Sequence, residues 1–148
     1  MGEAAEYLCK VMGYDKLLPS SSGVEACESA IKLARRWAYS HKHIVNADEA
    51  TVLVANGCFW GRSITACSGS DDDQRRHKFG PFTPGFDFFE FGDLEGIEVK
   101  LKNNPNVCAV MIEPIQGENG VRIPPEGFMK KLSKLCKKHD VLLICDEV

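Results

Sequence analysis

Several features that would assign a function directly are missing from this chain of 148 residues. It has no C-x-x-C pair and no histidine cluster at metal-ligand spacing, so we expect no metal site. No apolar run approaches the roughly 18 residues of a membrane span, and the first residues resemble neither a signal sequence nor an Arg-rich transit peptide. The net charge of -3 gives no general attraction for nucleic acid or for an anionic membrane. Small molecules and proteins are therefore the expected partners.

The composition is that of an ordinary globular protein, with 44% hydrophobic and 26% charged residues. Its seven cysteines stand singly, and we expect reduced, mostly buried thiols in an intracellular protein. The sequence does not distinguish the cytoplasm from the mitochondrial matrix. No internal repeat or low-complexity linker divides the chain, so residues 1–148 are expected to form one domain or part of one.

The apolar pattern predicts alternating helices and strands. Apolar residues recur at three- and four-residue steps over 24–39, and Ser22-Gly-Val-Glu25 before them has the form of a capping box. Short apolar or β-branched runs predict strands covered on both faces. They are 51–55, 86–91, 107–112 and 141–145, with helical spacing at 93–102 and 126–139. This alternation predicts a mainly parallel, doubly wound α/β sheet, whose ligands bind beyond the carboxyl ends of the strands.

An anion site is one interpretation of the segment before the first predicted helix. In Pro19-Ser-Ser-Ser-Gly-Val24, free N–H groups, hydroxyl groups and the helix dipole can together bind a phosphate. An ordinary helix cap explains Ser22 and Gly23 equally well.

A second candidate is Asp146, which follows the apolar run 142–145 at the expected end of a buried strand. An ionised carboxylate there requires a cation or strong donors: Mg²⁺, an arginine, a protonated ring nitrogen of a cofactor, or simply a local backbone group or basic side chain. An apolar run before Asp146-Glu147 is also typical of P-loop ATPases. That class requires a phosphate loop, and Gly57-Cys-Phe-Trp-Gly-Arg-Ser63 has one residue too few and Arg62 in place of lysine.

Two further segments follow predicted strands. In Gly57-Cys-Phe-Trp-Gly-Arg62, an aromatic face can stack on a planar heterocycle and the guanidinium can bind a carboxylate, although most aromatic side chains are core residues. Glu113-Pro-Ile-Gln-Gly-Glu118 brings two carboxylates and an amide to the same expected edge. Either glutamate alone would ordinarily be a solvated loop residue.

Taken in order along the chain, these segments resemble the class III aminotransferases among the fold-type I pyridoxal-phosphate enzymes. The resemblance covers essentially the whole chain and rests on Leu18-Pro19 through Gly23-Val-Glu-Ala26, Lys32-Leu-Ala-Arg-Arg-Trp37, Phe59-Trp-Gly-Arg62, Phe79-Gly-Pro-Phe-Thr-Pro-Gly-Phe86, Glu113-Pro-Ile-Gln-Gly-Glu118 and Asp146-Glu-Val148. Phe59-Trp60 and the 79–86 segment are more similar to the ornithine-specific members than to the acetylornithine or γ-aminobutyrate types.

The resemblance implies pyridoxal 5'-phosphate as cofactor and assigns roles to the candidate residues. The cofactor-binding positions would be Ser22, Gly23, Val24, Phe59, Asp146 and Val148. Phe59 would stack on the pyridine ring, Asp146 would pair with the ring nitrogen, and Glu113 would support the site. Substrate binding would involve Trp60, Arg62 for a carboxylate, and Glu118 as the partner of an arginine further along the family sequence.

The implied reaction transfers the δ-amino group of ornithine to 2-oxoglutarate in a homodimer or higher oligomer. Residues 1–148 would be part of the large cofactor-binding domain, because the family's N-terminal tyrosines, its cofactor-binding lysine and its small domain have no counterpart here. These residues alone are therefore not expected to catalyse the reaction. Ser20-Ser21-Ser22 stands where the ornithine enzymes usually have Met-Asn-Thr, so one asparagine contribution is lost. An alternative is a non-catalytic segment that serves only subunit association.

Overall fold

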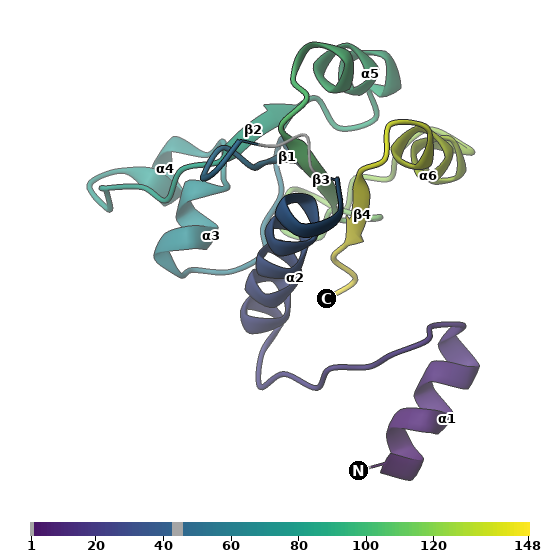
Figure 1. Cartoon of the computed structure of the whole chain (residues 1–148). Helices are drawn as coiled ribbons and strands as arrows, with labels where there is room; N and C mark the ends of the chain where they lie inside the picture. The colour runs from purple at the N-terminus through teal and green to yellow at the C-terminus, as the bar shows by residue number, and fades with distance from the viewer. Residues whose placement is uncertain (1, 43–45) are drawn as a thin grey trace.

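The fold is α/β, seen in a computed structural model that describes residues 2–42 and 46–148 (Figure 1). Its elements, in chain order, are α1 (Gly2–Met12), α2 (Gly23–Trp37), the π-helix η1 (Ala38–Lys42), β1 (Thr51–Ala55), α3 (Ile64–Ser68), α4 (Asp73–Arg76), β2 (Phe86–Phe89), α5 (Leu94–Asn103), β3 (Val107–Ile112), α6 (Phe128–Lys138) and β4 (Leu142–Cys145). In this part of the chain, no helix is both long enough and apolar enough to cross a membrane.

The four strands form a parallel sheet in the order β2-β1-β3-β4, which confirms the predicted fold class. Ile112, the last residue of β3, pairs with Cys145, the last residue of β4. The residues that follow them, Glu113 and Asp146, therefore leave the sheet side by side. Since parallel strands all end at one edge, the loops after β1, β3 and β4 meet there.

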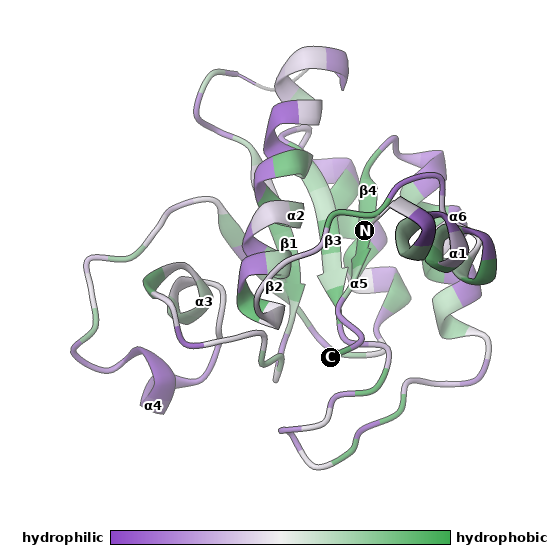
Figure 2. Ribbon diagram, turned by 90° about the horizontal axis from the view of Figure 1, so that it is seen from below, coloured by the Kyte–Doolittle hydropathy of each residue, from purple (hydrophilic) through white to green (hydrophobic). Residues whose placement is uncertain are grey.

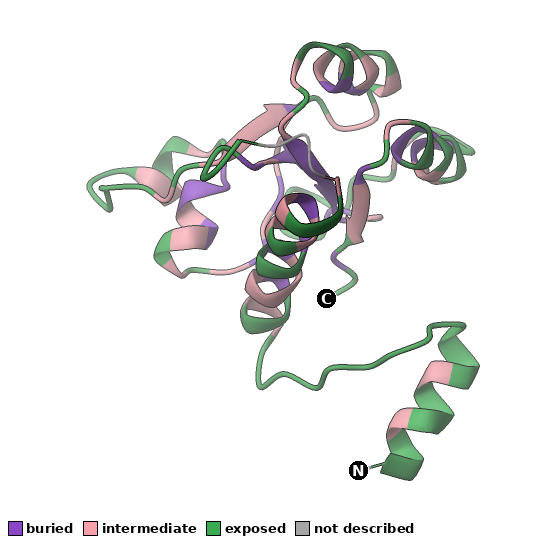
Figure 3. Cartoon of the chain, in the orientation of Figure 1, coloured by how far each residue is buried: buried purple, intermediate pink, exposed green. Residues whose placement is uncertain are grey.

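Helices cover both faces of the sheet and create two separate cores (Figure 2). Side chains alternate between faces along a strand, so Val52 and Val54 of β1 face α2 while Leu53 and Ala55 face α5 and α6. This explains why the predicted strands read as continuous apolar runs. The two central strands, β1 and β3, are the most buried elements, whereas α1 and the segment after it are almost entirely exposed (Figure 3).

Helix α2 begins where the capping box predicted. The Ser22 hydroxyl accepts the Glu25 N–H at 3.4 Å, and the Glu25 carboxylate accepts the Ser21 N–H at 3.0 Å, one residue before the position expected for a reciprocal box. The helical turns continue as η1, at the end of which Lys42 Nζ donates to the Val107 carbonyl at 2.9 Å. Lys42 thereby fixes this end of the helix to the amino end of β3.

The predicted strands and long helices are all present, and no observed end differs from the predicted one by more than two residues. Strand β2 stops at Phe89 rather than at residue 91, and α6 begins two residues later than residue 126. Helices α1, α3 and α4 were not predicted. Of the cysteines, which are all free thiols, the buried ones are Cys27, Cys58, Cys108 and Cys136.

Helix α5 offers a matched test of the core. Ile97 is fully buried against the sheet, whereas Val99 on the same helix is 55% exposed. Replacing Ile97 with Ala should lower the free energy of unfolding by about 2–5 kcal/mol, because the emptied volume is only partly refilled. Replacing Val99 with Ala should change it by no more than about 0.5 kcal/mol. Urea unfolding of both variants measures the difference, and equal losses would contradict this packing of α5.

Candidate active site

A pocket of about 640 Å³ lies at the carboxyl edge of the sheet. It brings together most of the residues selected from the sequence: Gly23, Val24, Phe59, Trp60, Glu113, Glu118, Asp146 and Val148. They come from the start of α2 and from the loops after β1, β3 and β4. Ser22 and Arg62 are not among the residues that line it.

The first turn of α2 forms one wall. The Ser22 hydroxyl accepts the Glu25 N–H, and the Ser22 carbonyl accepts the Ala26 N–H. Within the described residues, the N–H groups of Gly23 and Val24 have no acceptor. Unpaired N–H groups at the positive end of a helix dipole bind anions. This wall is therefore suited to a phosphate.

Close packing fixes that wall to its neighbours. A Cβ at Gly23 would lie 2.9 Å from Cγ2 of Val148, and a Cβ at Gly61 would overlap Cγ2 of Val24. Gly61 also has φ of 141°, in a region that other residues rarely adopt. Glycine at both positions lets the loop after β1 and the segment after β4 reach the start of α2.

Glu113 controls the position of Phe59. It directly follows β3, is only 6% exposed, and accepts the Phe59 N–H on Oε2 at 3.0 Å. Burial raises the pKa of Glu113, and the neighbouring Asp146 carboxylate adds to the rise, while the hydrogen bond from Phe59 opposes it. The glutamate thus holds the loop that carries the half-buried aromatic ring.

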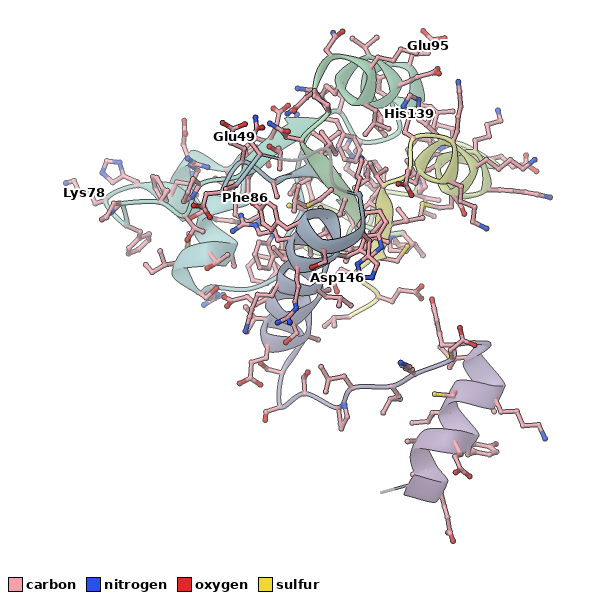
Figure 4. All side chains as sticks on the ribbon, viewed as in Figure 1. Glu49, Lys78, Phe86, Glu95, His139 and Asp146 are labelled. Atoms are coloured by element: carbon pink, nitrogen blue, oxygen red, sulfur yellow. The ribbon has the colours of Figure 1, made fainter. Side chains whose placement is uncertain are left out.

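Asp146 is a buried carboxylate beside α2 (Figure 4). It is 7% exposed, and its Oδ1 accepts the Val148 N–H at 3.2 Å. Among the described residues, no lysine, arginine or histidine forms an ion pair with it. Of the local partners that remained open from the sequence, the described residues thus provide a backbone N–H but no basic side chain. Burial, reinforced by Asp146, also raises the pKa of the adjacent Cys27 thiol to about 12, so this thiol stays neutral.

A second pocket of about 400 Å³ adjoins the first and shares Phe59, Trp60, Gly61 and Glu118 with it. Arg62 lines only this second pocket, where its Cζ lies 5.9 Å from the centre of the Phe59 ring. Trp60 is only 5% exposed, and its Nε1 donates to the Gly69 carbonyl at 3.3 Å. Trp60 therefore also belongs to the core, as most aromatic residues do.

Sequence reasoning missed Asp71 and Arg75, which hold the loop after β1, and gave no partner for the Gln116 amide. Asp71 accepts the Gly57 N–H at 2.8 Å, Arg75 donates to the Cys58 carbonyl at 2.9 Å, and Gln116, fully buried, donates to the Asn56 carbonyl at 2.8 Å. Gln116 lies in a segment already selected, between two glutamates. Asp71 and Arg75 lie in a polar stretch whose spacing gives no signal for these contacts.

The raised pKa of Glu113 makes stability depend on pH. The unfolded chain loses this proton near the ordinary pKa of 4.5 and the folded chain only at higher pH, so the free energy of unfolding should fall as pH rises through that interval. Glu113→Gln removes the titration but keeps an oxygen for the Phe59 N–H. We expect this variant to show a smaller fall, and to be at least as stable as the unmodified protein at neutral pH.

Urea unfolding between about pH 4 and pH 8 checks this prediction. Glu118→Gln is the control, because Glu118 is exposed on the loop after β3. If the Glu113 variant kept the pH dependence of the unmodified protein, the buried carboxyl would not be its source.

Comparison with known proteins places the site in a family. "Probable ornithine aminotransferase, mitochondrial" of Caenorhabditis elegans is 52% identical over 148 residues, which is 100% of this chain and 35% of that protein. A solved ornithine aminotransferase from Toxoplasma gondii ME49 matches with a TM-score of 0.93 and 45% identity, over 97% of this chain and 34% of the other. An acetylornithine aminotransferase from Elizabethkingia anophelis gives a TM-score of 0.78 and 38% identity, over 99% and 32%. The chain thus spans about a third of these relatives' length. Since the family described as "Aminotransferase class-III" matches residues 1–148, this chain belongs to the class III aminotransferases.

Proposed function

We propose that the protein carrying these residues is a pyridoxal-phosphate-dependent aminotransferase that uses ornithine as amino donor and 2-oxoglutarate as acceptor. The observation that carries the proposal is Asp146, a buried carboxylate without a cationic partner among the described residues. A buried charge of this kind is costly unless a cation binds to it. A protonated ring nitrogen of a cofactor is such a cation.

The donor set of the pocket fits pyridoxal phosphate. The unpaired N–H groups of Gly23 and Val24 suit the phosphate, the Phe59 face suits an aromatic ring, and Asp146 suits the ring nitrogen. When bound, this cofactor supplies an electron sink that stabilises a carbanion at the substrate carbon. Asp146 holds the proton on the ring nitrogen, while Glu113 keeps Phe59 in place through its backbone N–H.

Substrates would enter from the second pocket. Arg62 is exposed there and offers a planar guanidinium to a substrate carboxylate, while Glu118, shared by both pockets, can pair with a cationic group. Trp60, although largely core, closes the wall between them. The choice of ornithine is supported by the Phe59-Trp60 pair and by the relatives from Caenorhabditis elegans and Toxoplasma gondii, which are ornithine aminotransferases by name.

Residues 1–148 would form part of the large cofactor-binding domain, with further segments completing the pocket. We also propose association into a homodimer or higher oligomer. Large apolar side chains are exposed on α1 and on the loop after β3, which supports association because soluble proteins rarely leave such surface uncovered. These side chains are Tyr7, Leu8, Val11, Met12, Ile115, Val121 and Ile123. Several relatives are mitochondrial by name, so a mitochondrial site of action is part of the proposal.

Asp146→Asn tests the assignment of the cofactor. The change keeps the size of the side chain but removes the charge, so transamination in the complete protein should fall by about two orders of magnitude or more. Asp140→Asn is a matched control, because Asp140 is exposed near the amino end of β4 and its φ of 51° is one that asparagine tolerates. Steady-state turnover of ornithine measures both. Near-normal turnover in the Asp146 variant would refute the role.

Arg62→Lys tests substrate choice. Lysine keeps the charge but loses the planar fork, so the half-reaction with the dicarboxylate should suffer more than the half-reaction with ornithine. Single-turnover absorbance changes measure each half-reaction separately. Arg36→Lys is the control, because Arg36 is exposed on α2 and the same replacement there leaves the pocket unchanged. Equal losses in both half-reactions would mean that Arg62 is structural.

A further inference from the structure

The segment 71–75, at the start of α4, forms hydrogen bonds to the loop that carries Phe59. Asp71 Oδ1 accepts the Gly57 N–H at 2.8 Å, and Arg75 Nη1 donates to the Cys58 carbonyl at 2.9 Å. The Arg75 guanidinium also lies over the Phe59 ring, with Cζ 4.8 Å from the ring centre. One short segment thus holds both the backbone before Phe59 and the ring itself.

Contacts within the protein hold the Arg75 side chain in place. Its Nε forms an ion pair with Asp72 Oδ2 at 3.1 Å, and its side chain is 28% exposed. Asp72 is itself anchored as the cap of α4, where Oδ1 accepts the Gln74 N–H at 2.8 Å. A cation held in this way loses little further freedom when it packs on an aromatic ring, and partial burial strengthens the attraction.

Arg62 differs from Arg75 in each of these respects, although both guanidinium groups lie near the same ring. Arg62 is exposed, its Cζ is 5.9 Å from the ring centre, and it makes no hydrogen bond or ion pair to another described residue. Arg62 remains available to a ligand, whereas the bonds of Arg75 are already made within the protein. The two arginines therefore serve different purposes.

We propose that Arg75 is a positioning residue for Phe59: its guanidinium sets the orientation of the ring that packs against the cofactor. The proposal rests on the function proposed above. Glu113 fixes the Phe59 N–H from the sheet side, and Arg75 fixes the preceding carbonyl and the ring from the α4 side. Without Arg75 the ring rotates more freely, so a planar ligand must order it on binding. Affinity for the cofactor should then fall about 3- to 30-fold.

The test compares Arg75→Gln, Arg75→Lys and the control Arg76→Gln in the complete protein. Gln keeps a donor for the Cys58 carbonyl but has no charge, whereas Lys keeps the charge. Arg76 is the matched control, because it makes the same kinds of contact elsewhere. It donates to the Ser68 and Ser70 carbonyls, and its Cζ lies 4.4 Å from the centre of the Phe82 ring. The readouts are the dissociation constant of pyridoxal phosphate, the circular dichroism of the bound cofactor, and hydrogen exchange at the Phe59 amide of the cofactor-free protein.

We expect Arg75→Gln to weaken binding, alter the cofactor's circular dichroism and speed exchange at Phe59. Arg75→Lys should recover part of each change, and Arg76→Gln should resemble the unmodified protein. The proposal is overturned if Arg75→Gln matches the unmodified protein, if Lys recovers nothing, or if Arg76→Gln causes the same changes. If the unmodified protein binds no pyridoxal phosphate, the proposed function fails, and exchange at Phe59 decides the positioning role alone.

Discussion

The burial of two neighbouring carboxylates is the constraint on which the rest of the site depends. Glu113 and Asp146 leave adjacent strands together because Ile112 pairs with Cys145 in the sheet. Removing a charge from water costs several kcal/mol even after the protein relaxes. The chain limits that cost at Glu113 through a raised pKa and a backbone donor, and at Asp146 through one N–H. Among the described residues, no basic side chain forms an ion pair with Asp146.

Much of this arrangement could be predicted because it follows from periodicity. Continuous apolar runs identified the strands, and parallel strands must end at one edge, so polar residues after those runs had to meet. Asp146 and Glu113 were found in this way, and the Ser22 cap marked the start of α2 correctly. These predictions needed only the residues within each element.

Other parts could not be predicted, because they depend on contacts between segments that have no regular pattern. Arg75 and Asp71 lie in a polar stretch where any charged residue would normally be solvated, and only the folded chain brings them to Gly57 and Cys58. Trp60 was assigned to substrate, yet its burial against Phe86 depends on where α3 and the following turn lead the chain. Helix α1 was not predicted although Tyr7, Leu8, Val11 and Met12 recur at helical spacing, and none of its residues is buried.

The contact between Gly23 and Val148 joins residues from nearly opposite ends of the sheet-forming sequence. Closing so long a loop has an entropic cost that the chain offsets only after β1, β3 and β4 have paired. The wall of the pocket beside α2 is therefore complete only when Val148 has packed against the start of this helix. During synthesis on the ribosome, this wall cannot form until Val148, which follows β4, has left the exit tunnel.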